Sequence, residues 1–162
     1  MTTRSVLHDT FCLERRYEAS PARVFQAFAD PAAKRQWFTG PSDWTQHESS
    51  FDFREGGGEV SVSGPDGGPL ISFRTTYLDI VADERIVYTY EMAMDGKRIS
   101  VSVATIELRP EAGGTRLIVT EQGAYLDGLD APKFRIEGTE GLLDALGTFL
   151  AGDDTGQGGT GL

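Results

Sequence analysis

Cysteine, histidine and long hydrophobic runs are scarce in this chain of 162 residues. It contains one cysteine, Cys12, and two histidines. One cysteine cannot form an internal disulfide and fits a reducing compartment. Because Cys12 lies in an alternating apolar stretch, we expect its thiol to be buried and structural. No run approaches the ~20 apolar residues that span a bilayer, and residues 1–10 lack the apolar segment of a secretion signal. These features predict a cytoplasmic protein without a membrane span.

Positive charge is also in short supply. The chain has 15 lysines and arginines against 25 aspartates and glutamates, for a net charge of −10. A surface of this sign repels phosphate backbones and anionic lipids. Nucleic acids and membranes are therefore not expected as partners.

Motifs for catalysis, metals and cofactors are missing as well. The sequence has no GxSxG, HExxH or GxxxxGK[ST] pattern. His8 and His47 have no cysteine or carboxylate at metal-ligand spacing. We expect no metal and no cofactor. The remaining candidates for a general acid or base are Glu121 and Glu137, whose pKa would rise in an apolar pocket.

Two helix starts follow each other near the beginning of the chain. Ser20 precedes Pro21, and Asp30 precedes Pro31. A short polar N-cap followed by proline at the first helical position is typical of a helix start. The sequence therefore predicts two short helices directly after the first strand.

Alternating apolar residues predict seven strands. They cover residues 10–17, 45–54, 58–63, 70–81, 85–93, 98–109 and 115–123. Short turn sequences separate the last six, and Asp95-Gly96 is the strongest hairpin signal among them. Such short connections join antiparallel neighbours. The result is a six-stranded antiparallel meander that the first strand can complete.

A long helix is predicted over residues 132–150. Its apolar positions include Phe134, Leu142 and Leu146. Gly138, Gly141 and Gly147 are costly in a helix, by ~1 kcal/mol each relative to alanine. Either the helix passes close to something bulky at these glycines, or good packing tolerates them. Residues 152–162 are rich in glycine and predict a flexible tail after a single domain of residues 1–151.

These elements predict an α+β fold. A long antiparallel sheet with a single long helix must curve around that helix so that each buries one face. The space between a bent sheet and its helix is a natural cavity.

This arrangement resembles the helix-grip fold of the START and pollen-allergen-like superfamily (SRPBCC). Within it, the chain is most similar to the branch related to the activator of the Hsp90 ATPase. The resemblance rests on Glu14-Arg15, residues 17–21, Val24-Phe25, Asp30-Pro31, Trp37-Phe38, residues 52–57, 84–90, 114–121, 137–139 and 142–146. These matches extend in order over residues ~11–151. The resemblance implies a curved seven-stranded antiparallel sheet around the long C-terminal helix.

Strand alternation indicates which side chains face the cavity. On residues 85–93, one face carries Ile86, Tyr88, Tyr90 and Met92, and we expect it to form the inner wall. Tyrosine hydroxyls there can each donate one hydrogen bond to a mostly apolar ligand. The candidate ligand-binding residues are Trp37, Phe38, Phe51, Phe53, Phe73, Tyr77, Tyr88, Tyr90, Met92, Glu121, Phe134, Gly138 and Leu142.

The resemblance makes the first and last strands neighbours, which points Arg15 and Glu121 into the same interior. An unpaired buried charge costs several kcal/mol, so each would require the other. We therefore expect a buried Arg15–Glu121 ion pair. It serves either to fix the strand register or to orient a ligand.

Three functions are compatible with these features. The first is binding of a small, mostly apolar ligand such as a lipid, a polyketide or an aromatic metabolite. The second is a cyclase- or hydrolase-like enzyme that uses a carboxylate of the cavity, since the superfamily includes aromatic polyketide cyclases. The third is interaction with a chaperone, which the branch name suggests, or with a repressor. Exposed edge strands also favour a weak homodimer.

Overall fold

The computed structural model describes residues 4–160, with the side chains of residues 4–152. Its elements in chain order are β1 (Val6–Tyr17), α1 (Pro21–Ala29), α2 (Pro31–Trp37), β2 (Trp44–Phe51), β3 (Gly58–Pro65), β4 (Ile71–Val81), β5 (Arg85–Met94), β6 (Lys97–Glu111), β7 (Gly114–Leu126) and α3 (Pro132–Thr160).

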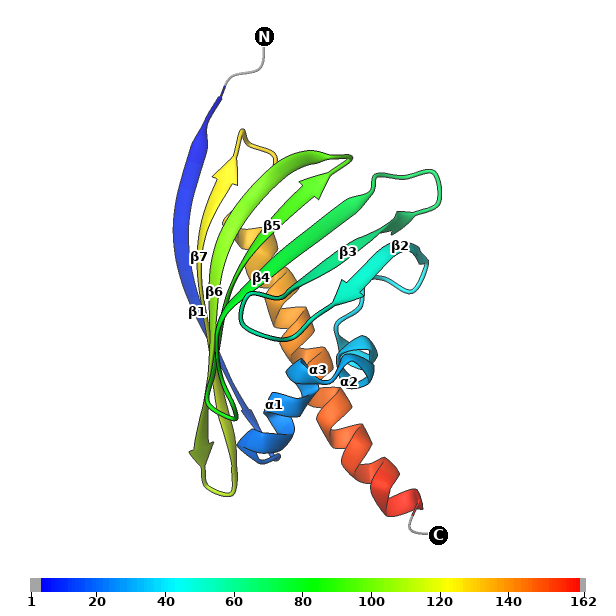
Figure 1. The fold of residues 1–162 in the computed structure, drawn as a ribbon, viewed down its shortest axis with the longest axis vertical. Helices are drawn as coiled ribbons and strands as arrows, with labels where there is room; N and C mark the ends of the chain where they lie inside the picture. Colours follow the sequence, from blue (N-terminus) through cyan, green and yellow to red (C-terminus); the bar gives the residue numbers. More distant parts are fainter. Residues whose placement is uncertain (1–3, 161–162) are drawn as a thin grey trace.

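The strands form one curved antiparallel sheet of seven strands in the order β1-β7-β6-β5-β4-β3-β2 (Figure 1). The six-stranded meander and its completion by β1 are thus confirmed. The β5–β6 hairpin turns at Asp95 (φ 51°) and Gly96 (φ 79°). Two successive left-handed residues match the twist of the flanking strands, which is why Asp-Gly predicts this turn.

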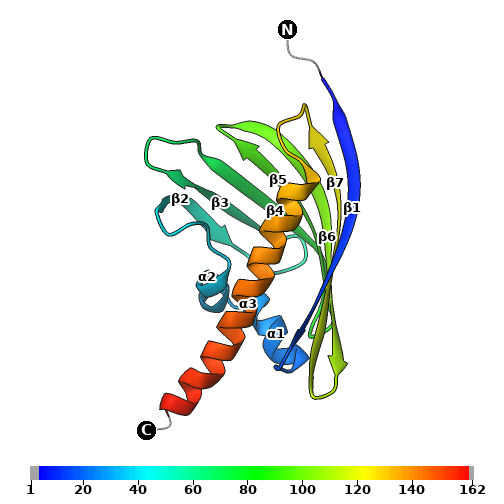
Figure 2. The same ribbon diagram turned by 180° about the vertical axis from the view of Figure 1, so that it is seen from behind.

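Both predicted helix starts are confirmed. The Ser20 side chain accepts a hydrogen bond from the Arg23 backbone N–H, and the Asp30 side chain accepts one from the Ala33 N–H. Each contact satisfies a backbone donor that the first helical turn leaves without a partner. Helices α1 and α2 follow directly from β1 and lie beside α3 at one end of the sheet (Figure 2).

Helix α3 crosses the concave face of the sheet diagonally (Figure 2). Its core contacts come from the buried side chains Leu143, Leu146 and Leu150, which belong to one hydrophobic cluster with residues of β1, α1, β6 and β7. The Tyr17 hydroxyl donates a hydrogen bond of 2.7 Å to the Leu143 carbonyl oxygen. The concave face therefore holds the second half of α3 through both apolar packing and a buried hydrogen bond.

The glycines of α3 differ in their surroundings. A Cβ atom added to Gly147 would lie 3.1 Å from the Tyr17 ring, so the helix does pass close to a bulky side chain there. No atom lies within 4 Å of a Cβ added to Gly138 or Gly141. Close approach therefore explains Gly147 alone.

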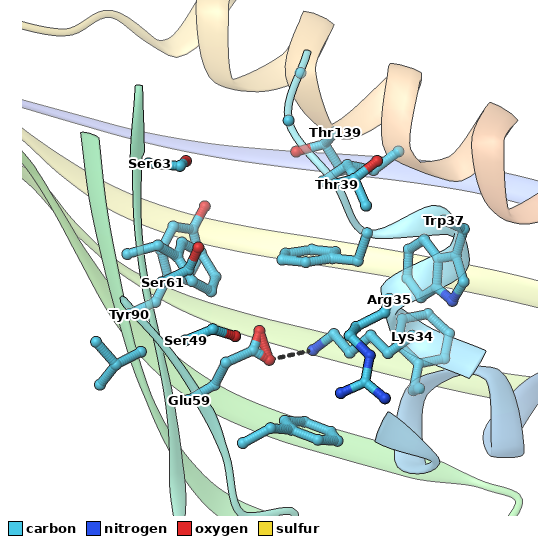
Figure 3. A pocket seen from close by; sticks show the side chains of 18 of the residues that line it. Lys34, Arg35, Trp37, Thr39, Ser49, Glu59, Ser61, Ser63, Tyr90 and Thr139 are labelled. Carbon is cyan, nitrogen blue, oxygen red and sulfur yellow. Dashed lines mark hydrogen bonds and ion pairs between the residues drawn. The ribbon is translucent and has the colours of Figure 1, made fainter. Parts of the chain in front are cut away.

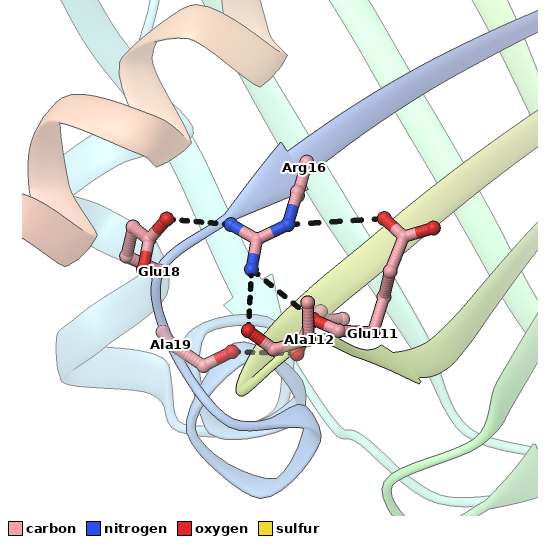
Figure 4. A network of polar contacts seen from close by, with 6 residues as sticks. Arg16, Glu18, Ala19, Glu111 and Ala112 are labelled. Atoms are coloured by element: carbon pink, nitrogen blue, oxygen red, sulfur yellow. Dashed lines mark hydrogen bonds and ion pairs between the residues drawn. The ribbon is translucent and has the colours of Figure 1, made fainter.

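A polar network fixes the corner between β1 and α1 (Figure 4). The Arg16 guanidinium donates to the carbonyl oxygens of Glu111 (3.1 Å) and Ala112 (2.9 Å) in the β6–β7 turn. The Thr115 hydroxyl donates to the Ala19 carbonyl oxygen at 2.6 Å. The chain between β1 and α1 is thereby attached to the turn that carries β7.

The structure differs from two of the predictions. Cys12 is exposed, not buried, because it alternates with the buried Phe11 and so lies on the other face of β1. Helix α3 continues to Thr160, past the expected end near residue 150. Residues 161 and 162 of the expected tail lie outside the described residues, and the flexibility of residues 152–162 stays a prediction. Within the described range, no helix has the length and apolarity that crossing a membrane requires.

Leu146 tests the packing of α3. The side chain is fully buried, so Leu146→Ala leaves a cavity, and we expect a loss of ~2–5 kcal/mol in the free energy of unfolding. Urea unfolding followed by circular dichroism measures it. The exposed Thr148 on the same helix supplies the control variant Thr148→Ala, which should change stability by less than ~1 kcal/mol. Equal losses for the two variants would contradict the assigned packing.

Candidate functional site

A cavity of about 1010 Å³ lies between the concave face of the sheet, α2 and the first half of α3. Aromatic side chains form much of its wall. Phe38 and Phe73 lie 5.6 Å apart between ring centroids, and Phe73 and Tyr90 lie 4.9 Å apart. These three rings form a continuous aromatic surface from α2 to the middle of the sheet.

Most of the predicted ligand-binding residues line this cavity. They are Trp37, Phe38, Phe51, Phe73, Tyr88, Tyr90, Met92, Glu121, Gly138 and Leu142. Phe53 and Tyr77 do not line it; their rings pack against each other at 4.9 Å, next to the cavity wall. Phe134 is 56% exposed and lies outside the cavity. Glu137 is also exposed and is not part of the wall.

A buried ion pair joins α2 to β3 in the cavity wall. The Lys34 Nζ atom lies 2.8 Å from Glu59 Oε2 (Figure 3). It also lies 3.2 Å from the Tyr77 hydroxyl and 4.6 Å from the centre of the Phe38 ring. Burial lowers the pKa of Lys34, while the charge of Glu59 and the hydrogen bond with it act in the opposite direction. The pair therefore links α2 to β3 within the wall of the cavity.

A second polar group lies where α3 begins. Arg135 pairs with Asp130 and donates hydrogen bonds to the Ser100 hydroxyl (3.1 Å) and the Tyr90 hydroxyl (3.0 Å). The Tyr90 hydroxyl in turn donates to Glu121 Oε1 at 2.5 Å. These contacts connect α3, β5 and β7 through buried side chains.

Glu121 is 4% exposed, and its protonation state decides the chemistry of this end of the cavity. Burial raises the pKa of Glu121 above its ordinary value of 4.5, although the hydrogen bond from Tyr90, the charge of Arg135 and the hydrogen bond with Thr139 all lower it. A raised pKa favours the neutral acid, which can donate a hydrogen bond or a proton.

The expected ion pair between Arg15 and Glu121 is wrong. The register places Arg15 opposite Leu117, while Glu121 lies opposite Phe11. Four residues along a strand are about 13 Å, which is too far for an ion pair. Arg15 instead lies 3.5 Å from Asp144 and 3.9 Å from Glu140, both on α3.

Polar side chains that the sequence analysis did not single out also line the cavity. They include Lys34, Ser49, Glu59, Ser61, Ser63, Arg135 and Thr139. The serines lie together on the β2–β3 side, with Thr139 on the helix side (Figure 3). A signal for Arg135 and Thr139 was present in the sequence, since residues 135, 139, 142 and 146 follow the 4-3-4 spacing of one helix face. Tracing only apolar residues led to Phe134 instead.

The site can bind and orient a molecule, and it can supply a carboxylic acid. No group of three or more histidine, cysteine or acidic side chains suited to a metal ion occurs among residues 4–152. The lining supplies hydrogen-bonding groups, aromatic rings and the carboxyl groups of Glu59 and Glu121.

Comparisons with known proteins agree with this architecture. Residues 18–151 match the model of a family described as Activator of Hsp90 ATPase homolog 1-like protein. A crystal structure of a Rhizobium loti protein shares 50% identity over 90% of this chain and 99% of that chain, with a TM-score of 0.84. An uncharacterized protein from Rhizobium leguminosarum shares 42% identity over 93% of this chain and 99% of that chain, with a TM-score of 0.87.

More distant structures share the fold. An AHSA1-like protein from Aeromonas hydrophila is 21% identical over 90% of this chain and 94% of that chain, with a TM-score of 0.67. A comparison with curated proteins gives no match. The relatives therefore establish the architecture.

The raised pKa of Glu121 predicts a pH dependence of stability. Unfolded Glu121 loses its proton near 4.5, whereas the folded chain retains it to higher pH. Between these two values the folded state binds more protons, so the free energy of unfolding falls as pH rises.

Glu121→Gln should abolish the part of this pH dependence that Glu121 contributes. Urea unfolding at several pH values between about 4 and 8 compares the two proteins. The exposed Glu137 provides the control Glu137→Gln, which should follow the wild-type profile. Parallel profiles for wild type and Glu121→Gln would contradict the assignment.

Proposed function

The chain belongs to the Activator of Hsp90 ATPase homolog 1-like family, and we propose that it binds a small, mostly apolar molecule between its sheet and α3. The ligand class comprises lipids, polyketides and aromatic metabolites. The observation that carries the proposal is the cavity of about 1010 Å³ with its aromatic wall. Pockets for drug-sized ligands measure ~300–1,000 Å³ and combine apolar walls with a few polar groups.

The arrangement of polar groups supports binding of a mostly apolar molecule. The buried cations Lys34 and Arg135 are each paired with an acidic side chain, so neither offers a free positive charge to an anionic ligand. The third cation of the lining, Arg35, is exposed. The aromatic rings of Phe38, Phe73 and Tyr90 offer apolar faces on which a flat or extended molecule can pack.

The position of Glu121 favours catalysis as a second candidate. A buried carboxyl group with a raised pKa is suited to general acid or base chemistry. Glu121 lines the cavity, and no ion pair with Arg15 shields it. A cyclase- or hydrolase-like activity would use this group on a bound substrate.

We further propose a cytoplasmic location and a weak homodimer. The chain has a single cysteine, which suits a reducing compartment. The sheet ends in β1 on one side and β2 on the other. Edge strands present backbone N–H and C=O groups that a second chain can pair with.

Two glycines of α3 provide a matched test of ligand binding. No atom lies within 4 Å of a Cβ added to Gly138 or Gly141, but only Gly138 lines the cavity. Phenylalanine at either position should be tolerated by the fold. We expect Gly138→Phe to fill the cavity and lower ligand affinity at least ~10-fold, whereas Gly141→Phe should bind like wild type.

The measurement has two parts. Native mass spectrometry of the protein purified from its own host identifies a co-purified molecule, and a thermal-shift screen of lipids, polyketides and aromatic metabolites identifies compounds that raise the melting temperature. The proposal fails if no apolar compound raises the melting temperature. It also fails if both glycine variants bind every hit as tightly as the wild type.

Sedimentation at micromolar concentration tests assembly. A weak homodimer should shift the average mass upward from the 17.6 kDa of one chain as concentration increases. A single species at the chain mass throughout the series would show a monomer.

A further inference from the structure

We propose that the ligand carries a carbonyl oxygen on an aromatic body, as in an aryl ketone or a quinone, and that the neutral carboxyl group of Glu121 donates a hydrogen bond to this oxygen. The inference deepens the ligand-binding function proposed above and rests on it. It specifies both the chemical class of the ligand and the group that recognises it.

Two charged side chains at this end of the cavity, Arg135 and Asp130, balance each other. The side chains of Arg135 and Asp130 are 10% and 9% exposed and form an ion pair with each other. The positive charge of Arg135 is therefore already balanced by Asp130. Among the described residues, no lysine or arginine forms an ion pair with Glu121. A buried carboxylate without its own cation is unfavourable by several kcal/mol, so the neutral acid is the stable form.

The hydrogen bonds of Tyr90 have a defined direction. The Tyr90 hydroxyl accepts from Arg135 Nη1 at 3.0 Å, and its own proton points to Glu121 Oε1 at 2.5 Å. One oxygen of Glu121 is thus an acceptor, and the carboxyl group also has a hydrogen bond with Thr139. The neutral carboxyl group also carries one O–H donor. A donor at the wall of an apolar cavity matches a ligand oxygen that accepts.

The groups around Glu121 from every packed element support this assignment. Strand β1 contributes Phe11 and strand β6 contributes Ala104, directly opposite Glu121 in the register. Strand β5 contributes the hydroxyls of Tyr88 and Tyr90, and α3 contributes Thr139 and the paired Arg135. Tyr125 of β7 and Asp130 complete the surroundings. A neutral carboxyl group offers no negative charge to an ammonium group, so a cationic ligand gains no ion pair with Glu121.

The cavity has room for an aromatic body beside Glu121. Glu121, Gly138 and Thr139 line the same cavity, and no atom lies within 4 Å of a Cβ added to Gly138. The Tyr90 hydroxyl donates a hydrogen bond to Glu121, and the Tyr90 ring lies next to Phe73, which lies next to Phe38. An aromatic body can therefore pack along these rings while its carbonyl oxygen reaches Glu121.

Three probes with the same naphthalene body separate the possibilities. Acetylnaphthalene carries a carbonyl oxygen, ethylnaphthalene has no polar group, and naphthylethylamine carries a cation. Titration calorimetry with the full chain measures the three affinities. We expect the ketone to bind ~5–10-fold tighter than the hydrocarbon, as one net hydrogen bond provides. The amine should bind more weakly than the ketone. Infrared spectroscopy should show a lowered carbonyl stretching frequency for the bound ketone.

Variants of Glu121 assign the effect to this side chain. Glu121→Gln keeps an N–H donor, so the ketone preference should persist and become independent of pH. In the wild type the preference should decline as pH rises through the pKa of Glu121, because the donor is lost. Glu121→Leu should bind the ketone and the hydrocarbon equally. Thermal melts test whether both variants are folded. If the leucine variant is unfolded, the pH dependence of the ketone preference in Glu121→Gln still tests the role of Glu121.

The outcomes distinguish this inference from the broader function. If ethylnaphthalene binds and the ketone has no advantage, the inference is wrong and ligand binding stands. If the amine binds tightest and Glu121→Gln abolishes that binding, Glu121 is a carboxylate and the inference is wrong. If none of the three probes binds, and no compound of the thermal-shift screen does, both proposals are wrong.

Discussion

The structure depends on a mismatch of width between one helix and one sheet. An α-helix with its side chains is about 10 Å across, whereas seven strands at ~4.8 Å spacing span about 29 Å. Helix α3 therefore cannot cover the whole concave face. Helices α1 and α2 cover one end of the remainder, and the uncovered part is the cavity. The cavity is thus a direct consequence of the topology, and its lining residues determine what it holds.

Burial constrains the polar residues of that lining. Charged side chains are stable in an apolar wall only when they are paired, and Lys34–Glu59 and Arg135–Asp130 meet this condition. The first pair connects α2 with β3. The second connects α3 with the loop before it, and Arg135 also reaches the sheet through its hydrogen bonds to Ser100 and Tyr90. Glu121 remains as the acidic side chain whose partners, Tyr90 and Thr139, are uncharged. The chemical character of the site is therefore concentrated at one residue.

Local patterns predicted the fold well, because each signal acts over a few residues. Ser20, Asp30 and Asp95-Gly96 satisfy nearby backbone groups or set nearby dihedral angles, and alternation identified the inner face of β5. The predicted Arg15–Glu121 pair was wrong because alternation indicates which face of a strand a residue lies on but not its partner on the neighbouring strand. The register places Leu117 opposite Arg15, four residues before Glu121. Lys34 and Arg135 escaped detection because their acidic partners, 25 and five residues away, become neighbours only after folding. Phe134 was misplaced by a helix face traced through apolar residues alone.

The two halves of α3 serve different purposes. From Leu143 onward the helix is held by Tyr17, by buried leucines and by the Arg23 side chain, which donates to the Leu150 carbonyl oxygen at 2.9 Å. Before Leu143 it borders the cavity through Arg135, Gly138 and Thr139. Substitutions in the first half can reshape the cavity while the anchoring half is unchanged. Such a division allows the interior space to vary while the folded state is retained, which is a route to diversity within a single architecture.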